Sequence, residues 1–465
     1  MQGKKIRNNI LISISVQLVS LLVSFILSFL VPKFINEYQY SYWQMYVLYA
    51  SYVGILHFGL LDGIVLRYSQ YDYEDLDKAC IRSQFQILLI STAAFSFILL
   101  GLSGVLFGGV SSRIAILVAV SIITKNVVTY NTYSFQITNR IDRYAMLILA
   151  QRVSYGAVAV ALLALRVNQF EWYCIADLFG DCVGIVFAQF FNKGMYFGKS
   201  IPIVEALKEW RINVSSGIFL MLANWSSLIM AGSAKIIVQW HWDELTFGKM
   251  SFAFSVSNLF LTFVTAISVV LFPSLKRMEQ DELPKLYKNI RCILVPVLFV
   301  GIIAYYPGCV LLKWFLPKYS ESLRFLGILL PMVIYTSKVS LLTNNYLKAY
   351  RKENYMLYAN LISAAAAIVM FVISAYILNM LEAVLISLVL ATMINSILSE
   401  IYVCKIIRID LRRDFIIEAM MTAGFIFCTQ NLRFGVGCIC YVGFVAIYLI
   451  MERNRIIQTI KDEGK

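Results

Sequence analysis

Long apolar runs alternate with short polar connections along the whole chain. A helix that crosses a bilayer needs about 20 mostly apolar residues, and fourteen stretches have this length and character. They lie at 10–32, 43–61, 83–107, 113–135, 144–166, 170–191, 214–238, 247–272, 292–313, 323–347, 356–379, 382–404, 415–431 and 434–451. The pattern predicts an all-α polytopic membrane protein with about 14 transmembrane helices.

The stretch 210–277 shows the pattern most clearly. Two apolar runs flank a short aromatic turn at 240–242, and basic residues lie at both outer ends. Positive ends in the cytoplasm and aromatic residues at the far interface are typical of a membrane hairpin. Lys235 lies inside the first of these runs. Because a charge facing lipid is costly, we expect Lys235 to face a protein cavity.

The distribution of basic residues fixes the predicted orientation. With the N-terminus inside, 28 of the 40 Lys and Arg residues lie in cytoplasmic segments and only 8 lie outside. One missed span would reverse every later loop and remove this bias. The sequence therefore predicts that both termini are cytoplasmic. The many Lys and Arg residues of the cytoplasmic segments also explain the net charge of +13. We therefore do not expect nucleic acid as a partner.

Composition and cysteine usage exclude several classes of protein. The chain is 60% hydrophobic and 14% charged, whereas soluble domains carry about 25% charged residues. No connection between spans is long enough to fold as a catalytic domain, so we do not expect an enzyme. The nine Cys form no CxxC pair and do not cluster with the two His, so we expect no metal site and no cofactor. The segment 278–290 has an amphipathic pattern that predicts an interfacial helix.

An internal repeat is suggested by two similar stretches, KNVVTYNTYSFQITNRIDRYAM from Lys125 and KVSLLTNNYLKAYRKENYM from Lys338. Each begins with Lys, continues with Asn, Thr and Tyr, and ends in a basic turn before Tyr. The first covers the fourth and fifth spans, and the second covers the tenth and eleventh. Repeated halves are common in transporters. We therefore expect two pseudo-symmetric six-helix lobes, 1–200 and 201–410, followed by two C-terminal helices in 411–465.

Four cations lie inside predicted spans and are candidates for binding an anionic substrate in a cavity: Lys125, Arg152, Lys235 and Lys338. Polar residues at helical spacing accompany them and would line the same cavity: Ser121, Thr129, Thr132, Asn224 and Asn345. Lys125 and Lys338 lie too near the middle of their spans to reach an interface easily, whereas the other two cations have a plainer interpretation. Lys235 could extend to the nearer interface, and Arg152 could hold a helix end or pair with Asp181.

Two acidic residues, Asp177 and Asp181, lie one helical turn apart on the sixth span. From the sequence they are the only acidic pair expected to be buried. Two interpretations stay open for them, a structural hydrogen bond or the coupling of transport to an ion. Because cations near the middle of spans outnumber acids near the middle of spans, the sequence favours an anionic substrate.

The chain resembles the polysaccharide flippases of the multidrug/oligosaccharidyl-lipid/polysaccharide exporter superfamily. The resemblance rests on GLLDGIVLRYSQ at 59–70, the basic turn before Tyr144, and GKMSFAFS…AISVVLFPSLKR at 248–277. Such relatives often carry an Asp-Arg-like pair late in the seventh span, where this chain has Ala234 and Lys235. The positive charge is kept and the carboxylate is absent.

This resemblance implies a two-lobed protein that alternates between inward- and outward-facing states. It would move an undecaprenyl-pyrophosphate-linked oligosaccharide across the plasma membrane for the synthesis of O-antigen or capsule. Its partners would be the lipid-linked substrate, membrane lipids and other membrane proteins of polysaccharide assembly. Two alternatives share the predicted fold: a multidrug exporter, and a flippase for the lipid-linked peptidoglycan precursor.

Overall fold

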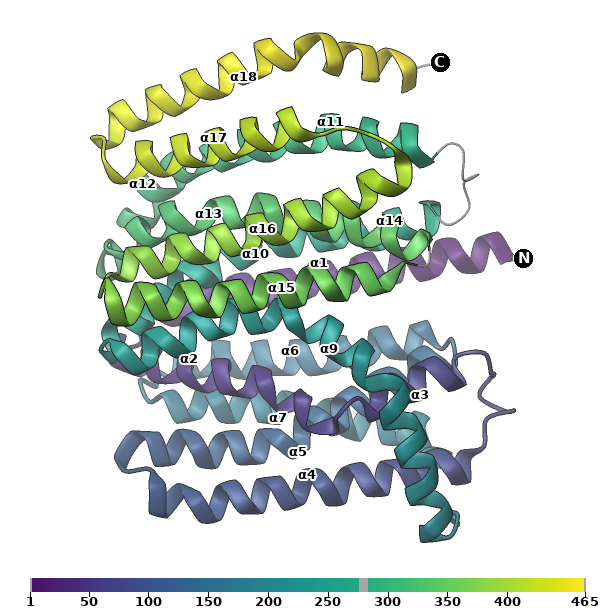
Figure 1. The fold of residues 1–465 in the computed structure, drawn as a ribbon. Helices are drawn as coiled ribbons and strands as arrows, with labels where there is room; N and C mark the ends of the chain where they lie inside the picture. The colour runs from purple at the N-terminus through teal and green to yellow at the C-terminus, as the bar shows by residue number, and fades with distance from the viewer. Residues whose placement is uncertain (1, 276–282, 351, 464–465) are drawn as a thin grey trace. The chain divides into compact units, whose positions relative to one another are not determined.

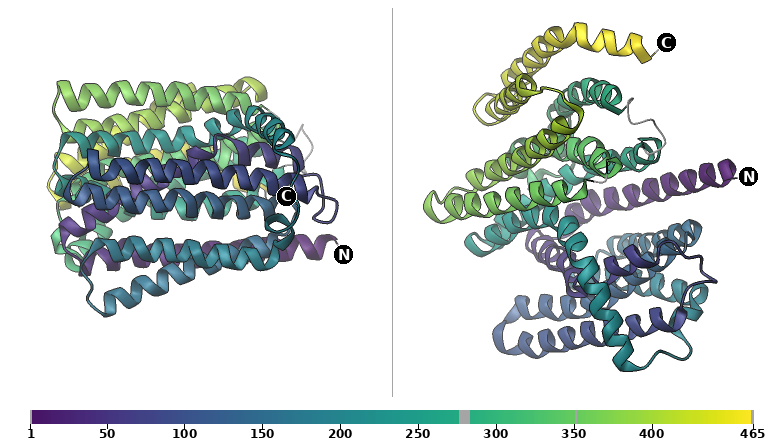
Figure 2. Two further views of the ribbon diagram at one scale, coloured as in Figure 1. Left: turned by 90° about the horizontal axis from the view of Figure 1, so that it is seen from below. Right: turned by 45° about the vertical axis from the view of Figure 1, so that its right-hand side comes forward.

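The computed structural model describes residues 2–275, 283–350 and 352–463, and this part of the chain is almost entirely helical, without a strand. The chain forms two compact units, residues 1–225 and 226–465, and the boundary falls inside one long helix. The sequence had placed the lobe boundary near residue 200. Each unit is an array of long helices joined by short connections (Figure 1, Figure 2).

The first unit contains helices that match the first six predicted spans. Their bounds are α1 Gln2–Phe34, α2 Glu37–Tyr52, η1 Val53–His57, α3 Leu60–Tyr68, α4 Lys78–Leu106, α5 Gly109–Ile137, α6 Ile141–Ala164, α7 Phe170–Phe191 and the short α8 Lys193–Tyr196. The next helix, α9 Ile203–His241, begins in this unit and bends by 57° before Leu228. Local capping fixes some helix starts: Asp77 accepts the backbone N–H groups of Ala79 and Cys80 at the start of α4.

The second unit contains the rest of α9 and the helices that match predicted spans eight to fourteen. Their bounds are α10 Glu244–Leu275, α11 Leu283–Gly301, η2 Ile302–Ala304, α12 Tyr305–Phe315, η3 Pro317–Tyr319, α13 Ser322–Lys338, η4 Val339–Thr343, α14 Asn344–Ala349, α15 Glu353–Val372, η5 Ile373–Ile377, α16 Leu381–Ile407, α17 Arg412–Gln430 and α18 Phe434–Glu463. Both η4 and η5 are single π-helical turns: η4 lies between α13 and α14, and η5 ends the helix that begins with α15.

Helices therefore occupy all fourteen stretches that the apolar pattern predicts. In the described residues, ten helices are long and apolar enough to cross a membrane, and two bent pairs bring the number to 12. The two remaining predicted spans correspond to α10 and α17. Large apolar side chains are exposed on the spanning helices, such as Ile90 and Phe97 of α4 and Ile439 of α18. The chain is a multi-pass membrane protein.

Two details differ from the expected helix boundaries. The second span is not continuous: Phe58 and Gly59 both adopt left-handed backbone conformations, and α2 and α3 meet at 55°. The interfacial helix expected at 278–290 lies partly outside the described residues. Its described part, from Leu283 onward, forms the first turns of α11 and continues directly into the ninth span.

Loop contacts support the predicted up-and-down path within each unit. In the first unit, the backbone N–H of Asn36 donates to Asn168 Oδ1 over 2.6 Å, which joins two connections predicted on the same side. At the other end, Arg67 donates to Glu209 over 2.8 Å. In the second unit, His241 and Asn379 likewise join two connections predicted outside. The alternation of the connections thus agrees with the threading, whereas the side that faces the cytoplasm stays a prediction.

Glycines allow a close crossing of α3 and the first half of α9. A Cβ atom built on Gly63 would overlap the backbone of Asn213, and one on Gly217 would overlap the backbone of Gly59. Arg67 then closes the same crossing by donating to Glu209 and Asn213. The GLLDGIVLRYSQ motif thus has a packing role in the first unit.

Candidate functional site

A buried polar cluster lies between α5 and α7 in the first unit. The Nζ atom of Lys125 lies 2.7 Å from Asp177 Oδ2 and 3.3 Å from Asp181 Oδ2. Asp181 is completely buried, while the Lys125 side chain keeps 24% of its surface exposed. The one-turn spacing of the two aspartates places both carboxylates on the same face of α7, so that one ammonium group can bridge them.

Three neutral side chains complete this cluster. Thr124 and Gln151 donate to Asp181 over 2.9 and 2.6 Å, and Tyr46 donates to Asp177 over 3.0 Å. These partners come from three different helices, α5, α6 and α2. With Lys125 and both aspartates ionised, the cluster carries one excess negative charge, which a proton or a monovalent cation could neutralise.

The polar stripe predicted along α5 is present, but most of its hydroxyl groups are used locally. Ser121, Thr129 and Thr132 donate to the backbone carbonyls of Val118, Lys125 and Val128, respectively. Ser121 is buried, and the two threonines are half-buried. Such bonds use the O–H donor of each hydroxyl within its own helix and leave its oxygen lone pairs free to accept from another donor.

The remaining cation expected in the first unit lies apart from this cluster. Arg152 is exposed on α6, and the recorded partners of Asp181 are Lys125, Thr124 and Gln151. The structure therefore does not pair Arg152 with Asp181. Asn224, on the first half of α9, is exposed.

Lys235 lies on the second half of α9, in the second unit. Its Nζ atom is 4.8 Å from the ring centroid of Phe254, and the side chain is half-buried. Among the described residues, no carboxylate lies within 4.0 Å of it. The ring face offers Lys235 a weak cation–π contact but no neutralising charge.

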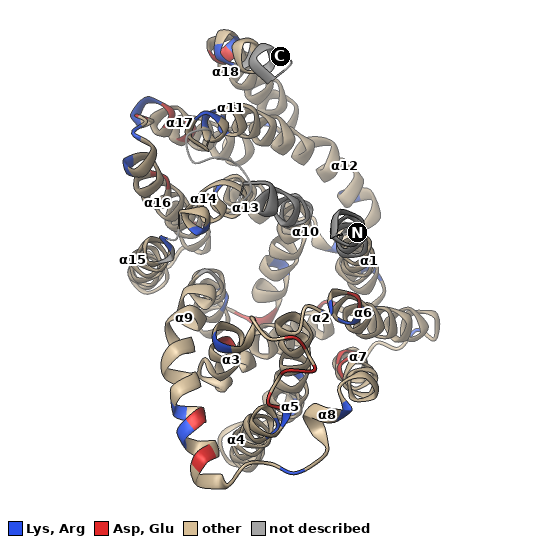
Figure 3. Cartoon of the chain, turned by 90° about the vertical axis from the view of Figure 1, so that its right-hand side faces the viewer, with Lys and Arg blue, Asp and Glu red and all other residues tan. Residues whose placement is uncertain are grey.

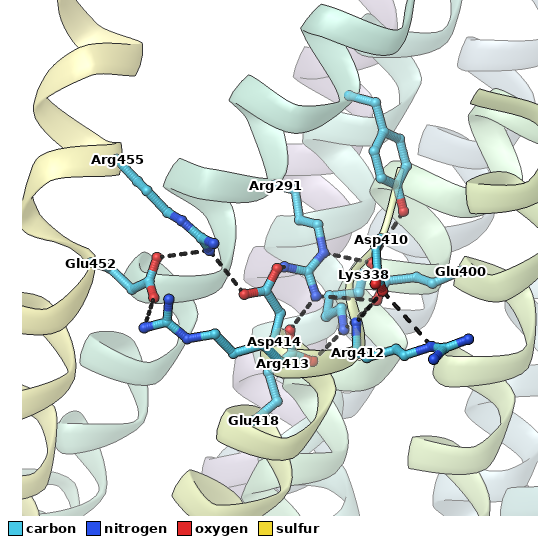
Figure 4. Close-up of polar contacts among 11 residues, drawn as sticks. Arg291, Lys338, Glu400, Asp410, Arg412, Arg413, Asp414, Glu418, Glu452 and Arg455 are labelled. Atoms are coloured by element: carbon cyan, nitrogen blue, oxygen red, sulfur yellow. Dashed lines mark hydrogen bonds and ion pairs between the residues drawn. The ribbon is translucent and has the colours of Figure 1, made fainter. Parts of the chain in front are cut away.

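The second unit contains a larger buried ion network, shown in Figure 4. Lys338 at the end of α13 is completely buried, and its Nζ atom lies 2.9 Å from Glu400 Oε2 of α16. It also pairs with Glu418 of α17. Glu400 is fully buried and Glu418 almost so, and Tyr287 donates a further hydrogen bond to Glu400 over 3.1 Å.

Arg291 of α11 extends this network toward the surface. Its guanidinium group contacts Glu400 over 3.0 Å, Glu418 over 2.5 Å and Asp414 over 3.2 Å. Asp414 in turn accepts from Arg455 of α18 over 3.0 Å. The planar guanidinium group has five donors, which suits it to hold several carboxylates at once. One continuous chain of ion pairs thus joins α13, α16, α11, α17 and α18.

The helix that carries Lys338 is irregular immediately after it. The π-helical turn η4 Val339–Thr343 separates Lys338 from Asn345, which is buried and donates to the Leu341 carbonyl over 2.9 Å. π-helical turns are rare and are often found at functional sites. The two polar residues that sequence analysis grouped together are therefore separated by an altered helical repeat.

Two expectations about buried charge are wrong. Asp177 and Asp181 are not the only buried acidic pair, because Glu400 and Glu418 are also buried and share Lys338. The expected excess of mid-span cations over mid-span acids does not hold in the described residues either. Asp177 and Asp181 accompany Lys125, and Glu400 and Glu418 accompany Lys338. No pattern along the chain predicts this pairing, because the two glutamates belong to different helices and only tertiary packing brings them to Lys338.

Arg291 is the functional candidate that sequence analysis missed most plainly. It directly precedes the predicted span 292–313, in a connection expected to be cytoplasmic, yet its side chain is 8% exposed and lies among carboxylates. The high density of Lys and Arg in that loop concealed it. Among the described residues, no cluster of His, Cys, Asp and Glu is arranged to hold a metal ion.

The sequence matches no family model and no curated protein. Solved structures, in contrast, match over most of the chain. A lipid II flippase MurJ in an inward closed conformation has a TM-score of 0.68 at 11% identity, covering 96% of this chain and 99% of that one. A multidrug resistance MATE family transporter of the MOP superfamily has TM-scores of 0.65 inward-facing, at 14% identity, and 0.55 outward-facing, at 13%. These two matches cover 86% of this chain and 98% and 95% of theirs. The chain therefore shares the fold of these solved structures.

Proposed function

We propose that this protein is a flippase that moves an undecaprenyl-pyrophosphate-linked oligosaccharide repeat unit across the plasma membrane by alternating access. The product would serve the synthesis of O-antigen, capsule or another cell-surface polysaccharide, together with other membrane proteins of that assembly. The fold supports a transporter, and one similar structure is named as a lipid II flippase. The absence of a catalytic domain among the predicted loops agrees with transport.

The observation that carries the proposal is the environment of Lys235. It is a cation within a predicted span, half-buried, with an aromatic ring but no carboxylate within 4.0 Å in the described part of the chain. Removing an ammonium group from water without a counter-ion is costly. A pyrophosphate diester would supply the missing negative charge, so substrate binding would relieve this cost.

The other in-span cations take different parts in the proposal. Lys125 and Lys338 are already held by carboxylates and could contact the pyrophosphate only by exchanging one of these partners. We therefore assign the first contact with the substrate to Lys235 and, in the first unit, to the exposed Arg152. Ser121, Thr129, Thr132, Asn224 and Asn345 would bind sugar hydroxyls through their remaining hydrogen-bonding capacity.

We also propose that Asp177 and Asp181 couple transport to a proton or a monovalent cation. Their cluster carries one excess negative charge when all three of its ionisable groups are charged. Uptake of one positive charge would neutralise it and weaken the hold of Asp177 and Asp181 on Lys125. Such a change in partners could bias the unit between two conformations.

A multidrug exporter is the second candidate, and the same cluster favours it. Exporters of organic cations need carboxylates at depth, and the first unit has two in contact with a single lysine. One similar structure is named as a multidrug resistance transporter. A flippase for the lipid-linked peptidoglycan precursor is the third candidate, because that substrate carries the same pyrophosphate group.

Transport assays in proteoliposomes separate the flippase from the multidrug exporter. We expect the protein to move a fluorescent undecaprenyl-pyrophosphate-linked oligosaccharide between leaflets, and an organic cation dye to be transported poorly. Lys235→Ala should reduce lipid movement strongly, Lys235→Arg should retain part of it, and Lys235→Glu should abolish it through repulsion of the pyrophosphate. Transport of the dye but not of the lipid would contradict the flippase proposal.

A matched control is available in the exposed cation Lys318, which lies in the short η3 turn. Lys318→Glu changes the net charge by the same amount as Lys235→Glu, away from the proposed contact. Normal lipid transport in Lys318→Glu and none in Lys235→Glu would show that position, not net charge, decides the effect. Full activity of Lys235→Glu at normal protein levels would leave Lys235 as a surface residue.

A further inference from the structure

A cavity of about 430 Å³ opens in the second unit beside the outer end of the ion network. Its walls come from the first turns of α11, the α16–α17 connection, the first turns of α17 and the last turns of α18. This size falls in the range of small-molecule and cofactor sites, about 300–1,000 Å³. All four wall segments lie at the end of the unit that the threading places at the cytoplasmic interface.

One part of the cavity lining is apolar. Val295 and Pro296 of α11 and Ile417 of α17 lie several residues inside their helices and contribute aliphatic surface, and Tyr448 of α18 adds an aromatic ring. Closer to the helix ends, the lining is charged or polar and includes Lys285 and Lys288. A ligand that fits both parts must itself be amphiphilic.

The charges around the cavity are unequal. The lining carboxylates Asp410, Asp414, Glu418 and Glu452 each have an Arg or Lys within 4.0 Å, as shown in part by Figure 4. Lys285 and Lys288, in contrast, are exposed and have no carboxylate within 4.0 Å among the described residues.

Among the described residues, those that line the cavity and their ion-pair partners comprise seven cations and five carboxylates. The two excess positive charges are those of Lys285 and Lys288. The mouth of the cavity therefore favours an anion.

We propose that this cavity binds an anionic phospholipid, with the phosphate group between Lys285 and Lys288 and the glycerol and first acyl carbons against Val295, Pro296 and Ile417. Basic pockets between transmembrane helices at the cytoplasmic surface are suited to such headgroups. The site is separate from the substrate contact at Lys235 and does not depend on which substrate the protein transports. Arg291 lines the same cavity, so a bound phosphate would lie next to the ion network that leads to Lys338.

Binding is tested with the full-length protein in detergent, titrated with phosphatidylglycerol or phosphatidylcholine and observed by native mass spectrometry. We expect phosphatidylglycerol to bind preferentially, and Lys285→Gln/Lys288→Gln to lower its affinity about tenfold or more, because each lysine near a lipid phosphate contributes to binding. The matched control is Lys348→Gln/Lys352→Gln. It removes two exposed lysines from another part of the same unit and should leave the affinity unchanged.

A native cysteine gives a second readout. Cys292 lines the cavity and is half-buried, whereas Cys404 is similarly half-buried on α16 and is outside the lining. Phosphatidylglycerol should slow alkylation of Cys292 by a water-soluble maleimide and leave Cys404 unaffected. The protection should disappear in Lys285→Gln/Lys288→Gln. This comparison is internal to one folded molecule, so it does not depend on the amount of protein.

The outcomes that overturn the proposal are distinct. Equal affinity for the two lipids, or equal losses in the lysine variant and its control, would mean that no anion site exists here. Equal protection of Cys292 by soluble glycerol phosphate would assign the site to a free phosphate compound instead of a lipid. Unchanged Cys292 alkylation at saturating phosphatidylglycerol would place the bound lipid elsewhere.

Discussion

The Nζ atom of Lys338 lies 2.9 Å from Glu400 Oε2, and both side chains are completely buried. In the first unit, Lys125 and Asp181 form a corresponding pair, 3.3 Å apart. Lys125 and Lys338 lie on the fourth and tenth predicted spans, and their partners lie on the sixth and twelfth. The helix order advances by six in both cases. This agreement strengthens the internal repeat, because it involves two carboxylates that the sequence comparison did not use.

The first prediction concerns the stability of the second unit. Lys338→Met removes the ammonium group and leaves Arg291 as the one described cation that pairs with Glu400 and Glu418. Removing one partner of a buried ion pair typically costs about 3–5 kcal/mol. We expect a clearly lower unfolding temperature in detergent, and partial recovery when Glu418→Gln is added, since one stranded charge is then neutral. Lys348→Met, at an exposed site, is the control. A Lys338→Met protein as stable as the parent would contradict the network's role.

The second prediction concerns ion coupling in the first unit. Asp177→Asn and Asp181→Asn keep the shape of each side chain but remove the excess negative charge of the cluster. Transport in proteoliposomes should then lose its response to an imposed proton or sodium gradient. Asp142→Asn, at the start of α6, removes an exposed carboxylate and should behave like the parent. A gradient response that persists in both cluster variants would favour the structural interpretation of the two aspartates.

The third prediction concerns the crossing of α3 and α9. A methyl group at Gly63 or Gly217 would overlap the backbone of the facing helix. Each Gly→Ala substitution should therefore destabilise the protein by about 1–3 kcal/mol or prevent its accumulation. Gly104→Ala on α4 meets nothing within 4 Å and should be neutral or slightly stabilising. Thermal unfolding of the three variants tests this, and equal stability of all three would contradict the close crossing.

The fourth prediction concerns orientation. Gln169 and Lys318 are exposed in connections predicted outside, and Asp75 is exposed in a connection predicted inside. With cysteine at each position in turn, an impermeant maleimide should label the first two in intact cells and the third only after the cells are opened. The parent protein, labelled in the same way, is the control for reaction of the native cysteines. The reverse pattern would invert the threading.

The sequence by itself determined the class of protein and the positions of its helices. A run of apolar residues must form a helix in lipid, because its backbone groups have no other hydrogen-bonding partners there. This requirement is local, so each run could be located without its neighbours. The charge bias predicted that successive connections alternate between the two sides of the membrane. Loop contacts such as that between Asn36 and Asn168 agree with this alternation.

Only the tertiary structure decided which charges meet. The sequence showed that Lys338 is a cation inside a predicted span, where burial of a charge is costly. Its partners Glu400 and Glu418 come from two later helices, and Arg291 joins them from a predicted loop. No periodicity connects these residues, because an ion pair depends on how helices pack and rotate rather than on spacing along one helix. The same holds for Gly63. No side chain fits at this position, because the backbone of Asn213 lies against it where α3 and α9 cross.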